Sequence, residues 1–240
     1  MTLLARALSS GDLVADTNAK VSASEARALV ACGLKAIGRY VFFGSPRPGD
    51  IDEGELQLLT AAGLCVYLIQ HVRNPSWHAS EQSGTADAQA AISNAIRAGY
   101  DLPHGSDAPP LALVLDMEGL GNPGPGAFAH ASAWCEAVVL AGYQPAVYVG
   151  YDSGLSSPAL DSLPGLPVFW VDFGDPHQRP TPKRGYALRQ HAQSTLAGIG
   201  VDIDTVLQDG ALYGLADGDV NVETPDMRET PTLPELPGAA

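Results

Sequence analysis

The sequence predicts an α/β protein built as a (β/α)8 TIM-type barrel, irregular in its second half and followed by a disordered, acidic, proline-rich C-terminal tail. Apolar runs alternate with amphipathic segments from residue 12 to about residue 207, the apolar runs number eight, and they are apolar on both faces. Alternating strands and helices imply parallel pairing through crossover helices, and strands apolar on both faces belong inside a covered sheet. Eight such strands favour a closed barrel.

The eight runs have the length and composition of buried strands. In chain order they are residues 12–17, 34–42, 64–70, 111–116, 146–151, 168–173, 186–192 and 201–207. Helical spacing of apolar residues predicts a helix in each gap between the first five: residues 22–33, 52–63, 85–99 and 126–142. Each of these segments ends in glycine, which commonly follows a last helical turn. Ser22 and Glu25 form a capping-box pattern at the start of the first.

The second half of the chain is less regular than the first. Residues 152–167 and 174–185 are rich in proline and glycine and are expected to hold at most short helices. Beyond about residue 214 the sequence is acidic and proline-rich without periodicity, which predicts disorder. We therefore divide the chain into an N-terminal lead (1–10), the barrel (11–213) and a tail (214–240) that could link to or dock on a protein partner.

Composition excludes several classes of partner. The chain has 240 residues and a formal net charge of −14, from 27 acidic against 13 basic side chains. Phosphate binding needs clustered Lys and Arg, so a nucleic-acid partner and an anionic membrane surface are not expected. No apolar run approaches the roughly 20 residues of a membrane span, and the N-terminus does not have the pattern of a cleaved secretion signal. Export, if it occurs, would use another route, such as a phage or a secretion system.

The run LDMEG, residues 115–119, carries the strongest chemical signal because it places two acids directly after an apolar strand. In an extended segment, Asp116 and Glu118 point to the same side with Cα atoms roughly 6.5 to 7 Å apart. Such a pair suits hydrolysis of an acetal, in which one carboxyl group is protonated and the other ionised. The alternative is a turn that merely ends the strand, a role that Asp and Glu often take.

Polar side chains also end the other strands, and in a parallel barrel these ends share one rim where active sites lie. The candidate catalytic residues are Asp16, Asp116, Glu118, Asp202 and Asp204. The candidate substrate-binding residues are Arg39, Tyr40, Gln70, His71, Tyr148, Trp170, Asp172 and Gln190. Several have structural alternatives: Arg39 as a buried counter-ion to the acids, His71 as a core histidine, and the aromatic residues as core side chains.

Other chemistries have weaker support in the sequence. A ring of carboxylates with His71 or His191 could hold a divalent ion, but HExxH, paired-cysteine and EF-hand spacings are missing. GxSxG, GxxxxGK[ST] and a GxGxxG after a strand are missing too. We therefore expect neither a metal ion nor a cofactor.

These segments together resemble the glycoside-hydrolase-like barrels related to the family 25 lysozymes. The resemblance covers residues 12–210 and includes VADTN at 14–18, GLKAIGRYVF at 33–42, LALVLDMEG at 111–119, VFWVDF at 168–173 and VDIDTVL at 201–207. It departs from the family at VADTN, which lacks a Gly-Phe pair, and at Asp172, where the branch often has an uncharged residue.

The resemblance implies a muramidase-like enzyme that hydrolyses the β-1,4 bonds between the aminosugars of peptidoglycan. Glu118 would be the general acid, Asp116 the carboxylate that tunes or assists it, Asp16 the acid of the first strand, and Asp202 or Asp204 that of the last. Repulsion from Asp116 and Asp16 would raise the pKa of Glu118. The alternative is a catalytically inactive glycan-binding or phage- or secretion-associated structural domain that uses the same cleft.

Overall fold

The computed structural model describes residues 2–74, 76–101, 107–120, 126–174 and 179–219. Eight strands close into a barrel in the order β4-β3-β2-β9-β8-β7-β6-β5, and β5 pairs with β4 to complete the ring. Every one of them overlaps one of the eight predicted runs, which confirms the barrel. They are β2 (Leu13–Thr17), β3 (Ala36–Val41), β4 (Cys65–Gln70), β5 (Ala112–Met117), β6 (Gln144–Val149), β7 (Val168–Val171), β8 (Leu188–Leu196) and β9 (Ile199–Val206).

The eighth strand departs from the all-parallel barrel that the sequence predicts. Strand β9 is antiparallel to both of its neighbours, β8 and β2. Only Ala197 and Gly198 separate it from β8, and both have positive φ angles, of 53° and 86°. A two-residue turn of this kind makes a hairpin, whereas a parallel connection needs a crossover of a dozen or more residues. The short spacing between the two runs was the available signal for this reversal.

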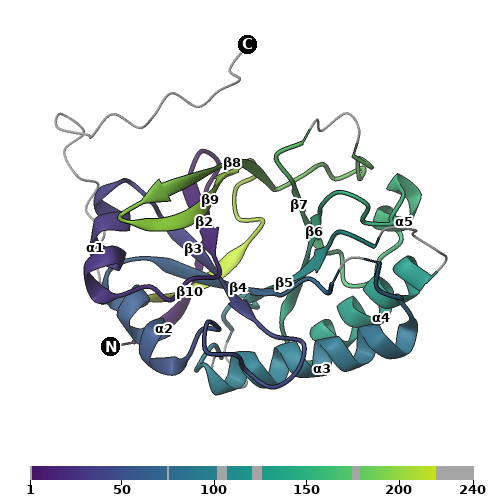
Figure 1. Ribbon diagram of the computed structural model, residues 1–240, viewed down its shortest axis with the longest axis horizontal. Helices are drawn as coiled ribbons and strands as arrows, with labels where there is room; N and C mark the ends of the chain where they lie inside the picture. Colours follow the sequence, from purple (N-terminus) through teal and green to yellow (C-terminus); the bar gives the residue numbers. More distant parts are fainter. Residues whose placement is uncertain (1, 75, 102–106, 121–125, 175–178, 220–240) are drawn as a thin grey trace, which may run out of the picture.

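The helices cover one side of the barrel. They are α1 (Ala23–Ala31), α2 (Glu53–Ala61), α3 (Glu81–Arg97), α4 (Gly126–Leu140) and the short α5 (Ser157–Asp161), so all four predicted helices are found. The capping box of Ser22 and Glu25 is present, while α3 begins earlier than predicted because Ser80 caps it. Figure 1 shows α3 and α4 along the side opposite the β8–β9 hairpin. No helix in the described part of the chain is long and apolar enough to cross a membrane.

Two further strands correct the domain boundaries. Residues 3–7, placed in the lead, form β1 (Leu3–Ala7), and residues 214–217, placed in the tail, belong to β10 (Tyr213–Asp217). The two strands pair antiparallel, and β10 also pairs with β4 at Val66. The short run at 213–217 is ordered because Leu215 and Ala216 are fully buried. The remainder of the predicted tail, residues 220–240, lies outside the described residues.

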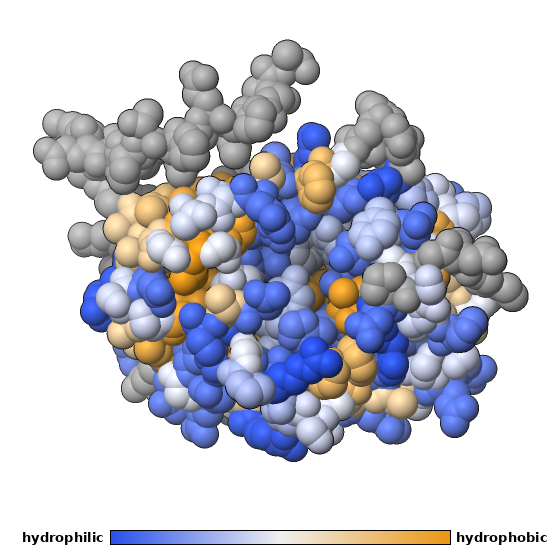
Figure 2. Space-filling view, viewed as in Figure 1, coloured by the Kyte–Doolittle hydropathy of each residue, from blue (hydrophilic) through white to orange (hydrophobic). Residues whose placement is uncertain are grey.

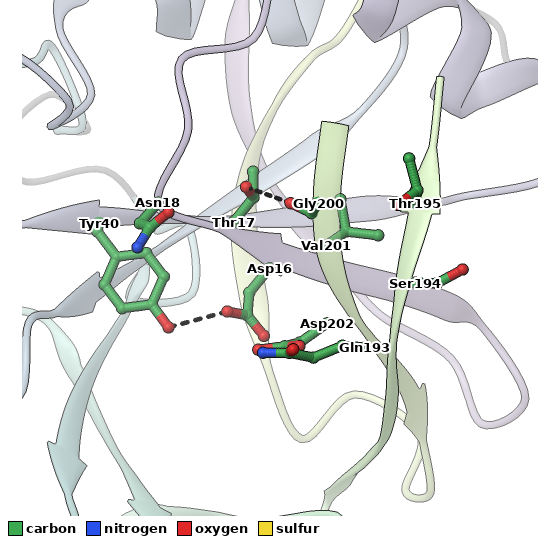
Figure 3. Close-up of a pocket in the computed structure, with 10 residues that line it drawn as sticks. All are labelled: Asp16, Thr17, Asn18, Tyr40, Gln193, Ser194, Thr195, Gly200, Val201 and Asp202. Carbon is green, nitrogen blue, oxygen red and sulfur yellow. Dashed lines mark hydrogen bonds between the residues drawn. The ribbon is translucent and has the colours of Figure 1, made fainter. Parts of the chain in front are cut away.

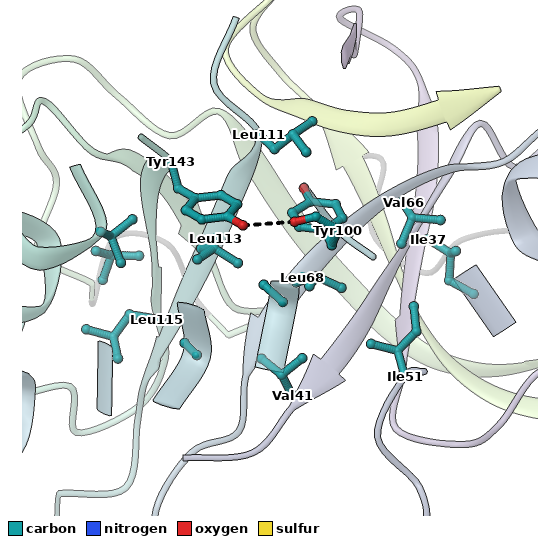
Figure 4. Packing of buried hydrophobic residues seen from close by; sticks show 14 of the residues in the cluster. Ile37, Val41, Ile51, Val66, Leu68, Tyr100, Leu111, Leu113, Leu115 and Tyr143 are labelled. Atoms are coloured by element: carbon teal, nitrogen blue, oxygen red, sulfur yellow. Dashed lines mark hydrogen bonds between the residues drawn. The ribbon is translucent and has the colours of Figure 1, made fainter. Parts of the chain in front are cut away.

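Apolar side chains fill two separate spaces. One cluster lies between the barrel and its helices, where Ile37, Val66 and Leu68 point outward and Tyr143 donates a hydrogen bond to the Tyr100 carbonyl at 2.9 Å (Figure 4). The other cluster, which includes Tyr67 and Trp170, fills the barrel interior. The face of the molecule that Figure 2 shows is largely hydrophilic, with an apolar area over α1 and the β8–β9 hairpin. The alternation along each strand thus decides which residues reach the barrel mouth.

Gly84 makes the close contact between α3 and α4 possible. A Cβ atom at this position would lie 2.2 Å from the carbonyl oxygen of His130. Although alanine is favoured over glycine in an exposed helix, we expect Gly84→Ala to destabilise the protein by about 1 to 3 kcal/mol because the helices must move apart. Urea unfolding measures this change, with Gln89→Ala on the exposed face of α3 as control. A Gly84→Ala protein at least as stable as the wild type would contradict the packing.

Candidate active site

Two adjoining cavities open at the C-terminal ends of the parallel strands. Their volumes are about 420 Å³ and 540 Å³, and they share Tyr40, Gln193 and Asp202. We call them together the acidic cleft. The larger is lined by Asp16, Thr17, Asn18, Tyr40, Gln193, Ser194, Thr195, Gly200, Val201 and Asp202. The smaller is lined by Tyr40, Ile69, Asp116, Glu118, Tyr148, Tyr151, Trp170, Asp172, Phe173, Gly174, Arg179, Gln190, Gln193 and Asp202.

The two acids of the LDMEG run both line the smaller cavity, as their spacing predicts. Asp116 lies in β5 opposite Tyr148 of β6 and is 8% exposed, whereas Glu118 lies just beyond the strand end and is half-buried. Gly150 leaves room for Glu118, because a Cβ atom there would lie 2.6 Å from both the Cβ and the Oε2 of Glu118. The glycine after β6 therefore fixes where this carboxyl group can lie.

Glu118 has the pKa of a group that is poised to exchange a proton near neutral pH. Burial raises its pKa to about 6, with further increases from the charges of Asp172 and Asp202 and an opposing effect from Arg179. This corrects the prediction that Asp116 and Asp16 would supply the repulsion. The physical reason lies in the fold: Asp172 directly follows β7, Asp202 lies in the antiparallel β9, and both line the same cavity as Glu118.

Asp116 is more deeply buried than Glu118, and its pKa is raised further above the ordinary value. Burial, then repulsion from Glu118 and Asp16, raises its pKa well above the ordinary value. Its Oδ1 atom is buried and has no hydrogen-bond donor among the described residues. Burial therefore favours the neutral form of the Asp116 carboxyl group, in contrast to the tuning charge that the sequence suggested.

Asp172 lines the same cavity and is held by an arginine that the sequence did not single out. Arg179 donates from Nε to Asp172 Oδ1 at 2.9 Å and from Nη2 to Oδ2 at 2.6 Å. Arg179 is the one cation among the described residues that line the acidic cleft, and this bidentate pair engages it with Asp172. Arg179 lies in the irregular segment after β7, where no periodic pattern indicates the direction of a side chain.

The larger cavity is built around Asp16 of β2, which lies opposite Asp202 of β9. Tyr40 donates from its hydroxyl to Asp16 Oδ1 at 2.8 Å, and Figure 3 shows Asp16, Asp202 and Gln193 close to one another beside this ring. Burial and the charge of Asp202 raise the pKa of Asp16 to about 7, against the lowering effect of Tyr40 and other hydrogen bonds. Burial also raises the pKa of Asp202.

Three other candidates form the polar floor of the cleft. Tyr148 donates to Gln190 Oε1 at 2.8 Å, and Trp170 donates from Nε1 to Asp204 Oδ1 at 3.0 Å. Tyr148, Trp170 and Gln190 all line the smaller cavity, as predicted. Asp204 does not: it is fully buried below Trp170, because β9 runs antiparallel and Asp204 therefore lies deeper in the barrel than Asp202. Of the two acids predicted for the last strand, Asp202 therefore lines the cleft and Asp204 does not.

Arg39 and Gln70 point away from the cleft, which corrects their assignment to substrate binding. They belong to the face of β3 and β4 that meets the helices, because side chains alternate along a strand. Arg39 pairs with Glu55 at 2.9 Å and donates to the Thr17 carbonyl. Gln70 donates to the Asp87 carbonyl at 2.6 Å and accepts from Trp134 at 2.7 Å.

His71 is a supporting residue and does not line the acidic cleft. Its Nε2 lies 3.1 Å from Asp50 Oδ1, and its ring lies 4.7 Å from that of Tyr40, centroid to centroid. His71 follows the end of β4, so its ring packs behind Tyr40 and supports the tyrosine that binds Asp16.

Several lining residues were missing from the candidates, among them Arg179, Gln193, Tyr151 and Phe173. Gln193 reaches the cleft because a bulge interrupts the β8–β9 register between Gln190 and Gln193, and no sequence pattern indicates that bulge. Tyr151 and Phe173 are 49% and 67% exposed, and each follows a strand end by one or two residues. Exposed aromatic residues near predicted strand ends were a usable signal. Among the described residues no group of three or more His, Cys, Asp or Glu side chains is arranged to hold a metal ion.

The chain belongs to the family of Rv2525c-like, glycoside hydrolase-like domains, whose model matches residues 27–209. No curated protein matches the sequence. Among solved structures, an uncharacterised protein of B. stearothermophilus is similar, with a TM-score of 0.62 and 18% identity over 82% of this chain and 96% of that one. The Tat-secreted protein Rv2525c of Mycobacterium tuberculosis, in complex with HEPES, is also similar. Its TM-score is 0.59, with 18% identity over 86% of this chain and 98% of that one.

A family 25 glycosyl hydrolase from Bacillus anthracis gives a TM-score of 0.52 and 15% identity over 82% of this chain and 89% of that one. The family match and this neighbour confirm the resemblance to glycoside-hydrolase-like barrels related to family 25.

The raised pKa of Asp16 makes a prediction about stability. Between its ordinary value of 3.8 and about 7, the folded protein holds a proton that the unfolded chain has released. The contribution of Asp16 to stability is thus fully present below about pH 4 and is lost as the pH rises through about 7. At about 1.4 kcal/mol per pKa unit the loss is at most about 4 kcal/mol.

Asp16→Asn should therefore flatten the dependence of the free energy of unfolding on pH between about 4 and 7. Chemical denaturation at a series of pH values measures this slope, with the exposed Asp209→Asn as the matched control. An unchanged slope in Asp16→Asn would show that Asp16 ionises normally in the folded protein.

Proposed function

We propose that this protein hydrolyses β-1,4 glycosidic bonds between the aminosugars of bacterial peptidoglycan, with Glu118 as the general acid. The observation that carries the proposal is the environment of Glu118: a half-buried carboxyl group in an open cavity, with its pKa raised to about 6 by burial and by two facing acids. A general acid works best when its pKa lies near the working pH. Glu118 would donate its proton to the oxygen of the leaving sugar.

The second carboxyl group in this mechanism is Asp202. It is half-exposed, whereas Asp16 and Asp116 are 2% and 8% exposed, and Arg179 already neutralises Asp172. Asp202 thus carries negative charge in the cavity most readily and would stabilise the positive charge that develops on the sugar ring. Asp116, as a neutral carboxyl group, would act as a hydrogen-bond donor to the sugar in the same cavity.

The cleft also suits a polymer of sugars. Two adjoining cavities offer places for neighbouring rings on either side of the bond to be cut. Tyr151 and Phe173 expose large parts of their rings at the smaller cavity, and aromatic faces stack on sugar rings. The resemblance to family 25 lysozymes supports peptidoglycan as the polymer.

Replacing Glu118 by Gln should remove the transferable proton and keep the size of the side chain. We expect release of soluble muropeptides from purified peptidoglycan to fall by about 10²- to 10⁴-fold, because this is what general acid catalysis contributes. Glu136→Gln, the same change at an exposed position on α4, is the control and should leave the rate unchanged.

Two results would contradict the proposed activity. One is a wild-type protein that binds insoluble peptidoglycan without releasing products, which would favour a non-catalytic glycan-binding domain. The other is equal rates in wild type and Glu118→Gln.

The charges around Glu118 predict opposite shifts of the pH profile. Activity should fall as the pH rises through about 6, because the general acid loses its proton. Asp202→Asn removes a repelling charge and should move this alkaline limb to lower pH, by about half a unit or more. Arg179→Gln removes the attracting charge and should move it to higher pH.

The profile of kcat/KM against pH measures both shifts. If the alkaline limb moves in the same direction in both variants, or does not move in either, Glu118 is not the acid whose titration sets the limb.

A further inference from the structure

Asp204 has no part in the proposed reaction, yet it is a fully buried acid that lies beside another. Asp16 and Asp204 are 2% and 0% exposed and lie on the paired strands β2 and β9, where Asp204 is opposite Val14. One oxygen of each is satisfied: Tyr40 donates to Asp16 Oδ1 at 2.8 Å, and Trp170 donates to Asp204 Oδ1 at 3.0 Å. The Oδ2 atom of each is buried and lacks a donor among the described residues.

The two side chains lie where they can hydrogen-bond to each other when one of them holds a proton, and this interaction lowers the pKa of Asp16 and raises the pKa of Asp204. Two carboxylates cannot make such a bond when both are ionised, because both can then only accept. One proton between the two Oδ2 atoms would satisfy both of them. Buried neighbouring acids avoid a double negative charge in the same way.

We propose that Asp204 keeps its proton at neutral pH and donates it in a hydrogen bond to the carboxylate of Asp16. Asp204 would then be a buried positioning residue, which fixes Asp16 in the wall of the cleft without touching substrate. This inference goes beyond the proposed hydrolysis and does not depend on it.

Gln190 also lowers the pKa of Asp16 through a side-chain hydrogen bond, whereas the side chains that hydrogen-bond to Asp204 are Trp170 and Asp16. The polar and titratable groups that face the pair are Tyr40 of β3, Tyr67 of β4, Asp116 of β5, Tyr148 of β6, Trp170 of β7, Gln190 of β8 and Asp202 of β9. None of these is a cation. The Tyr67 hydroxyl is buried and makes no hydrogen bond to a described residue, so it does not supply the missing donor.

The position of the proton follows from the depth of the two groups. Asp16 lines a cavity and accepts from Tyr40, which favours its ionised form, whereas Asp204 lies below the cavity floor. Burial and the charge of Asp16 raise the pKa of Asp204 well above its ordinary value. The pKa of Asp16 is about 7, whereas the raised pKa of Asp204 favours its protonated form, so Asp204 is the group that we expect to keep the proton.

Infrared difference spectroscopy tests where the proton is. At about pH 8, above the pKa of Asp16, the wild-type spectrum minus that of Asp204→Asn should contain the C=O stretch of one protonated carboxylic acid. The wild-type spectrum minus that of Asp16→Asn should lack this band, because Asp204 stays protonated next to an amide. Asp202→Asn, on the same strand but half-exposed, is the control and should also show no lost band.

Loss of the band in Asp16→Asn with its retention in Asp204→Asn would overturn the proposal, as would its retention in both. Should Asp204→Asn fail to fold, wild-type protein with ¹³C-labelled aspartate gives the same answer by NMR, with Asp16→Asn used for assignment. The Asp204 carboxyl signal should stay at its protonated position while that of Asp16 titrates near 7. An Asp204 signal that titrates in the acidic range would overturn the proposal.

Discussion

The antiparallel pairing of β9 with β2 closes the barrel and determines which acids line its cleft. Strand β9 closes the ring between β2 and β8, the first and last of the parallel strands. It also sets Asp202 opposite Asp16 at the mouth and places Asp204 one layer deeper. With β9 parallel, the order of these two acids along the barrel axis would be reversed. The two-residue turn at Ala197 and Gly198 therefore decides which acid can meet a substrate.

Burial of carboxyl groups with few cations gives the cleft its chemical character. Arg179 is the one cation among the lining residues that the structure describes, and it is already engaged by Asp172. Desolvation is accordingly the largest cause of the raised pKa values of Asp16, Asp116, Glu118 and Asp204. Depth then separates their roles: burial favours the neutral form most strongly in the deepest acids, Asp116 and Asp204, whereas the pKa of Glu118 is raised only to about 6. A buried acid is costly for stability, and such costs often accompany function.

The sequence predicted the barrel, the four helices and the central acid pair because each depends on local patterns. Strand and helix periods are visible in short windows, and the spacing of Asp116 and Glu118 alone places them on one side of β5. The sequence was a poorer guide to the direction of side chains whose position depends on tertiary structure. Arg39 and Gln70 lie near the same strand ends as true lining residues but on the opposite face. Arg179 and Gln193 reach the cleft through an irregular segment and a β-bulge, which no period describes.

The central claim is that this fold holds Glu118 as a proton donor near neutral pH. Its most direct test is an NMR titration of the Glu118 carboxyl carbon in protein labelled with ¹³C-glutamate, with Glu118→Gln used to assign the signal. The claim predicts a midpoint of about 6. A midpoint at the ordinary value of 4.5 would show that Glu118 is ionised at neutral pH, and it would contradict the role of the acidic cleft.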